Sequence, residues 1–274
     1  MNKLKSIIDN YPFIPDAIGL AISIFSIHLI YVLVIDPAVI DIEVASQTAG
    51  TVPERTMPII LKDLEQELCL ILGLWCLFLL ATRYRFSDSD QLLIDIDFTG
   101  LKEVDVSIET IRLKLEEAGE SVQGSTLIPA LKTSLDAFVV TESLESARNA
   151  GLDYCNLREE VIESRLTTVK YILWAIPSIG FLGTVRGIGE ALARADEAMQ
   201  GDISGVASSL GVAFNSTFTA LFVSLFLTLV ANSLRGREQE KIVKCKDFLS
   251  GDFMIQLKSI ELDGASKKAV SQEG

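Results

Sequence analysis

Long apolar stretches are the feature that most constrains how this chain folds. The first, at 17–35, contains no charged residue between Asp16 and Asp36. A run of about twenty apolar residues is long enough to cross a lipid bilayer as one helix. Because the bilayer core offers no water to the backbone, such a run must satisfy its own hydrogen bonds as a helix. The chain is therefore predicted to be an integral membrane protein built from helices.

Three further stretches support the same prediction. The four predicted spans are 17–35, 65–84, 169–192 and 207–234, and the second has the shortest apolar core. No cleavable signal peptide is indicated, because the first apolar run begins late and lacks a small-residue cleavage pattern after it. The predicted fold class is an all-α integral membrane protein with four transmembrane helices and long cytoplasmic helical extensions.

Lysine and arginine near the span ends predict the orientation, since these residues are enriched on the cytoplasmic side. They precede the first and third spans and follow the second and fourth. The predicted segments are a cytoplasmic N-terminus (1–16), periplasmic loops (36–64 and 193–206), an acidic cytoplasmic helical domain (85–168), and a cytoplasmic helix with a disordered tail (235–274). The protein is thus expected to be multi-pass, with both termini in the cytoplasm.

The acidic charge is concentrated in one part of the chain. The net charge is −13, and residues 86–165 hold seventeen Asp or Glu against seven Lys or Arg. This region is interpreted as a solvated helical domain with no nucleic-acid partner. A helix is expected to begin near 126–131 with Pro129 in its first turn. A longer helix is expected to run from 141 into the third span, and another to extend the fourth span over 235–257.

Two short segments of this domain differ in how far their sequence decides their secondary structure. The alternating stretch at 92–97 (LLIDID) fits a short strand or the start of a helix, and it is too short for periodicity to decide. The apolar spacing over 107–117 fits an amphipathic helix, which the glycines at 119 and 124 would then end.

The sequence contains no sign of an enzyme. A phosphate loop, zinc spacing such as HExxH and a nucleophile elbow are all absent from it. The four cysteines, Cys69, Cys76, Cys155 and Cys245, show no paired spacing and are interpreted as structural. No enzymatic activity, cofactor or metal is therefore expected.

Small residues recur at helical spacing in the last two spans. In the segment 174–189 (WAIPSIGFLGTVRGIG) the residues Gly180, Thr184 and Gly187 share one helical face with Ala191. The fourth span presents a similar face, with larger side chains in other directions; its members include Ala213, Thr217, Ala220 and Ser224. Such faces let membrane helices approach closely and let their hydroxyls bond across helices.

Thr184 and Thr217 are predicted to lie at the same depth. They stand sixteen residues before and seventeen residues after Gln200, near the middle of the connecting loop. An antiparallel pair of helices would bring them level, at 1.5 Å of rise per residue. The pair is a candidate ion pathway, and the alternative is that each threonine bonds a carbonyl of its own helix. No Asp or Glu lies in the middle of a span, so any titrating carboxylate in the pathway must come from another polypeptide.

These motifs resemble a known family. IGFLGTVRGI, beginning at Ile179, resembles the third-helix signature of the MotA/TolQ/ExbB proton channel family, and AFNSTFTAL, beginning at Ala213, resembles its last helix. The resemblance covers roughly 166–237, and the four-span layout is MotA-like. It implies a homopentamer in the bacterial inner membrane around a dimer of a single-span partner of the MotB/TolR/ExbD type. The partner's aspartate would titrate beside Thr184 and Thr217 while ion flow drives rotation.

Several features leave alternatives open. Arg186 stands where relatives have tryptophan or another apolar residue; it either snorkels or pairs with Glu190, or it forms a charge at the mouth of the pathway. Asn215 adds polarity near the pathway, so sodium is an alternative to protons. His28, the sole histidine, is interpreted as a neutral residue bonding a neighbouring helix or as a proton relay. A non-conducting oligomeric scaffold is the alternative function. The downstream task of the complex is left open among motility, outer-membrane energisation, export and defence.

Overall fold

The computed structural model is helical throughout the part of the chain that it describes. Described are residues 13–49, 56–84, 108, 111–113, 115, 116, 125–260 and 262, and no strand occurs among them. Four helices are long and apolar enough to cross a membrane: Ile14–Ser46, Leu64–Thr82, Leu144–Ala193 and Ser204–Ile260. Each overlaps one predicted span, and the predicted all-α membrane fold with four spans is confirmed. The side of the membrane that each segment faces stays a prediction.

The first span belongs to a longer helix than expected. Helix α2 (Phe13–Ile30) passes through a π-helical turn, η1 (Tyr31–Ile35), into α3 (Asp36–Ala49). In η1 the Asp36 amide donates to the Tyr31 carbonyl, five residues back. This wider turn lies just before Pro37, where an α-helix would set the proline ring against a carbonyl of the preceding turn. The segment 36–64, predicted as a loop, is therefore helical over α3, and it also contains α4 (Met57–Leu61).

Helix α5 (Leu64–Tyr84) packs on the first helix through both a polar contact and a close apolar contact. The Trp75 indole donates a hydrogen bond to the Asp16 carbonyl at 2.8 Å. Gly19 lies so close to Phe78 that a Cβ atom there would meet the ring at 2.3 Å. A glycine is thus needed at this helix crossing, because any larger residue would push the ring away.

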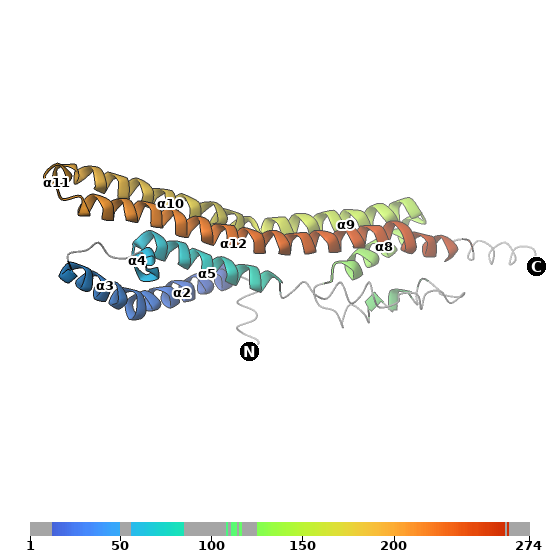
Figure 1. Ribbon diagram of the computed structural model, residues 1–274. Coiled ribbons are helices and arrows are strands. Elements are labelled where there is room, and N and C mark those ends of the chain that lie inside the picture. Colours follow the sequence, from blue (N-terminus) through green and yellow to red (C-terminus); the bar gives the residue numbers. More distant parts are fainter. Residues whose placement is uncertain are drawn as a thin grey trace, which may run out of the picture. The chain divides into compact units, whose positions relative to one another are not determined.

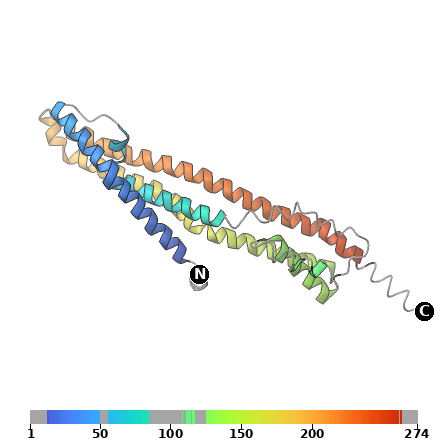
Figure 2. The same cartoon turned by 90° about the horizontal axis from the view of Figure 1, so that it is seen from below.

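Helices α10 (Thr167–Ala193) and α12 (Ser204–Phe248) form an antiparallel hairpin over the last two predicted spans, as both views show (Figures 1 and 2). The short helix α11 (Ala195–Met199) lies between them and is followed by Gly201, whose φ of 99° favours glycine. The hairpin carries the small residues identified in the sequence.

The helices α8 (Leu127–Thr141) and α9 (Leu144–Arg165) form a second compact unit with the end of α12 and the π-helical turn η3 (Leu249–Phe253). Pro129 lies in the first turn of α8, as predicted. The long helix expected to run from 141 into the third span is observed over Leu144–Ala193. It has one irregular turn at Leu166, between α9 and α10, where the amide is shared by the carbonyls of Ile162 and Glu163. Such sharing tightens the last turn of a helix.

This second unit has an apolar core with large side chains from α8, from the end of α12 and from η3, whereas α9 contributes the small residues Ala147 and Cys155. Its members are Leu127, Leu131, Leu135, Phe138, Leu249, Phe253 and Leu257, together with Ile111 and Leu115. The last two support the predicted amphipathic helix over 107–117 at the positions described there. The ambiguous stretch at 92–97, the glycines at 119 and 124, and the tail after 262 lie outside the described residues.

Candidate functional site

Three glycines of α10 allow α12 to approach closely. A Cβ atom on Gly180 would lie 2.4 Å from the Ala220 Cβ, and one on Gly183 would lie 2.5 Å from the Ser216 side chain. One on Gly187 would meet backbone atoms of α12 at 2.7 Å. The predicted small face is thus observed, and Gly183 belongs to it although the sequence analysis omitted it. Its spacing of three from Gly180 was the available signal.

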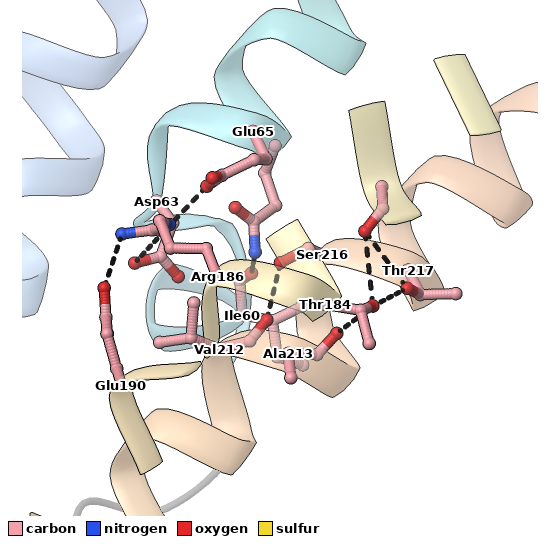
Figure 3. Close-up of polar contacts among 12 residues, drawn as sticks. Ile60, Asp63, Glu65, Thr184, Arg186, Glu190, Val212, Ala213, Ser216 and Thr217 are labelled. Atoms are coloured by element: carbon pink, nitrogen blue, oxygen red, sulfur yellow. Dashed lines mark hydrogen bonds and ion pairs between the residues drawn. The ribbon is translucent and has the colours of Figure 1, made fainter. Parts of the chain in front are cut away.

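The close approach brings Thr184 and Thr217 into direct contact (Figure 3). Their hydroxyl oxygens are hydrogen-bonded to each other. Thr184 Oγ1 also lies 3.0 Å from the Ala213 carbonyl oxygen and 3.3 Å from that of Gly180. Thr217 Oγ1 lies 3.2 Å from the same Gly180 oxygen. The depth match therefore predicted a real contact, and its bonds run mainly between helices rather than within one.

The hydrogen count of this threonine pair has a chemical consequence. Each hydroxyl carries one hydrogen, whereas the two hydroxyl oxygens and two carbonyl oxygens all accept. The site is richer in acceptors than in donors, so it can take a hydrogen bond from an outside acid or solvate a small cation. The pair has no ionisable group near neutral pH, which means that it cannot itself release a proton.

Most of the other predicted site residues on α12 are buried, and Ala213 and Ala220 lie against glycines of α10. Ala213 is 1% exposed and Ala220 is fully buried, while Asn215 is 8% exposed. The Ser224 hydroxyl donates to the Leu173 carbonyl of α10 at 3.4 Å. The large apolar residues of α12 point away; Phe214, Phe218, Phe222 and Leu225 are all more than 60% exposed. Within one chain the small residues thus form a helix contact, and their role in lining a pore stays a prediction.

Arg186 is surrounded by carboxylates (Figure 3). It pairs with Glu190 one turn along α10 at 3.4 Å, which is one of the contacts expected from the sequence. Its closest partner is Glu65 at the start of α5, at 2.7 Å, and Asp63 lies at 3.7 Å. The three acids outnumber the single guanidinium, so the net charge around Arg186 is negative.

The contact of α5 with this region was not predicted from the sequence. The Glu65 side chain is only 14% exposed, and its Cγ lies 3.1 Å from the position that a Cβ on Gly183 would take. The acidic start of α5 was visible in the sequence, but nothing local pointed to a contact with a helix 121 residues away. A carboxylate of this chain therefore lies beside the threonine pair's helix contact, although none occurs in mid-span.

In the α4–α5 corner, residues 56–66, polar side chains are partly or fully buried while the apolar Met57 is 72% exposed. Burial raises the pKa of the Asp63 carboxyl above its usual value, although the charges of Lys62 and Arg186 lower it. Gln66 is fully buried, and its amide nitrogen donates to the Ile60 carbonyl at 3.0 Å. The corner thus places polar groups against apolar helices.

His28 contacts the same helix α5. Its Nδ1 lies 2.8 Å from a carboxylate oxygen of Glu67, whose side chain is 15% exposed. This is the contact with a neighbouring helix that one of the two interpretations expected. A relay role for His28 stays a prediction.

Residues 123–247 match the family model described as the MotA/TolQ/ExbB proton channel family. The match includes the threonine pair, the three close-packed glycines and Arg186. No curated protein and no solved structure matches the chain.

Proposed function

We propose that this chain, whose residues 123–247 match the model of the MotA/TolQ/ExbB proton channel family, is the pore-forming subunit of a rotary complex driven by the ion-motive force. The family is one of membrane proton channels, and the subunit needs no enzymatic chemistry. In this proposal it forms a pentamer in the bacterial inner membrane with both termini in the cytoplasm. A dimer of a single-span MotB/TolR/ExbD-like protein supplies the titrating aspartate.

The observation that supports this proposal is the bonding of Thr184 and Thr217. Their site accepts more hydrogen bonds than it donates, so a neutral aspartic acid from a partner finds a ready acceptor there. A hydrogen-bonded neutral acid costs far less inside the bilayer than an unpaired carboxylate. Each charge that crosses gains about 2.3 kcal/mol per 100 mV, which is enough to bias a step between two packed states.

Alanine substitution of the threonines tests the proposal. Wild-type chain and variants are reconstituted with the single-span partner in vesicles, and ion flux is measured under an imposed potential. Thr184→Ala and Thr217→Ala are expected to assemble normally and to lose about tenfold or more in flux, since a lost bond of about 1.4 kcal/mol in the rate-limiting state is a factor of ten. Thr217→Ser, which keeps the hydroxyl, should restore most of it.

Ser178→Ala is the matched control, because the Ser178 hydroxyl bonds only the Trp174 carbonyl of its own helix. It should conduct like the wild type. If both threonine variants conduct at the wild-type rate, the pair is structural and the alternative of a non-conducting scaffold gains support. Loss of assembly in every variant would equally contradict a pathway role.

A further inference from the structure

Two buried cysteines meet in the second compact unit. Cys155 of α9 and Cys245 of α12 are 90 residues apart in the chain, and their sulfur atoms lie 3.3 Å apart. Both belong to the apolar core of the unit, since Cys155 is fully buried and Cys245 is 2% exposed. The thiols form one weak S–H···S contact, in which either sulfur can donate. The proposed ion pathway makes no use of these two thiols.

The antiparallel register of the two helices explains why the cysteines meet. A Cβ atom on Gly151 would lie 3.0 Å from Leu249 Cδ2, so these two residues face each other. Cys155 follows Gly151 by one helical turn, and Cys245 precedes Leu249 by the same four residues. The glycine allows the helices to approach closely, and the next turn of each helix then brings the two sulfur atoms into contact.

The distance between the sulfur atoms suits a disulfide bond. Such a bond is about 2.05 Å long, so the sulfurs need to approach by roughly 1.2 Å more. Displacements of this size occur through thermal motion in folded proteins. Cys69 and Cys76 cannot pair with each other in this way, because seven residues along α5 separate them by about 10.5 Å.

We propose that Cys155 and Cys245 form an oxidation site, which joins α9 to α12 by a reversible disulfide bond when the protein meets a peroxide. The first thiolate attacks the peroxide, breaks its O–O bond and becomes a sulfenic acid. The second thiol attacks that sulfur, so the S–S bond forms and water leaves. Two thiols and one hydrogen peroxide give one disulfide and two waters, and the two electrons lost by sulfur reduce the peroxide oxygens. The inference goes beyond the proposed function and does not depend on ion conduction.

Burial determines which oxidation product forms. The peroxide reaches a thiol only when α9 and α12 separate locally, because both side chains are almost inaccessible in the closed structure. When the helices close again, the sulfenic acid lies against the second thiol, which captures it before another peroxide does. A disulfide is therefore expected instead of sulfinic or sulfonic acids. Since the second unit is predicted to lie in the cytoplasm, where thiols are kept reduced, the bond is expected only under oxidative conditions.

The site is tested on the purified full chain in detergent. The chain is treated with hydrogen peroxide, its remaining thiols are alkylated, and its peptides are identified by mass spectrometry. Wild type is expected to lose two of its four thiols as one cross-link between the peptides that contain Cys155 and Cys245, and a reducing dithiol should restore both. The bond closes a long loop, so the Tm of the oxidised chain should rise by at least about 5 °C.

Cys69→Ala is the matched control, because Cys69 is also fully buried but its thiol contacts the Ile176 carbonyl at 3.7 Å instead of a second sulfur. It should form the cross-link as wild type does. Cys155→Ala should form none, and Cys245→Ala serves as the second variant if Cys155→Ala does not fold. Oxidation spread evenly over the four cysteines, disulfides that join only separate chains, or intact thiols at a peroxide concentration that oxidises the unfolded chain would each overturn the site.

Discussion

The α10–α12 hairpin and the second compact unit bury different kinds of side chain. In the hairpin, α12 buries Ala213 and Ser216 against α10 while Phe222 is 67% exposed. The unit that contains the hairpin, residues 1–81 and 167–232, buries large side chains such as Leu79 and Leu227 elsewhere. In the unit formed by 82–166 and 233–274, large side chains such as Leu249 and Phe253 are buried. Lipid tails are as apolar as leucine, so burying large side chains gains little in a membrane and close backbone approach gains more. Water reverses this preference.

The largest effect is expected from the core of the second unit. Leu249→Ala should lower the free energy of unfolding by about 2–5 kcal/mol, because Leu249 is fully buried and its removal leaves a cavity. Phe222→Ala, on the exposed face of α12, should change stability by less than about 0.5 kcal/mol. Thermal unfolding of both variants in detergent checks this. A large loss in Phe222→Ala would break the comparison, since it would mean that another chain packs on that face.

A smaller effect is expected at the close-packed glycines. Gly187→Ala should cost about 1–3 kcal/mol, because its Cβ would meet backbone atoms of α12 that cannot rotate away. Gly189→Ala, where nothing lies within 4 Å, should be neutral or stabilise slightly through helix propensity. The Tm values of the two variants are measured side by side. Equal values would show that the close approach of the α10 and α12 backbones does not stabilise the hairpin.

The smallest effect concerns Asp63, an acid of the first unit whose side chain is 14% exposed. Its pKa is raised by burial, so its neutral form is favoured in the folded state. The neutral Asp63 carboxyl therefore stabilises the folded protein fully at pH values below about 3.9, the pKa of an aspartate in the unfolded chain. This stabilisation is lost as the pH rises through the higher pKa that Asp63 has in the folded protein. The Tm of wild type minus that of Asp63→Asn should therefore fall as pH rises from about 4.

The control for this pH series is Asp202, which accepts hydrogen bonds from the Ser204 hydroxyl and amide. These bonds lower the pKa of Asp202, so its small contribution is present at high pH and is lost on acidification. The Tm difference for Asp202→Asn should have the opposite slope. A difference for Asp63→Asn that does not change with pH would contradict the buried position of its carboxyl.

Some of the candidate site followed from spacing along the chain. Thr184 and Thr217 are nearly equidistant from the loop, and a helical rise of fixed length converts that distance into depth, so their contact was predictable. The small face of α10 followed from helical periodicity. By contrast, the pairing of Arg186 with Glu65 joins positions 121 residues apart, and no periodicity connects them. The unpartnered oxygen of Asp63 was equally invisible, since burial depends on what packs around it.

Local composition determines the number of helices and their small faces. An apolar run long enough to cross a bilayer must form a helix there, because its backbone has to satisfy its own hydrogen bonds. The start of α8 near Pro129 is also determined by the local sequence, because proline is favoured in the first turn of a helix. The surroundings of Arg186, the burial of Gln66 and the contact of His28 with Glu67 depend on which helices meet and at what angle. Packing sets those contacts through side chains far apart in the chain, so the polar corner beside the threonine pair emerges only in the folded molecule.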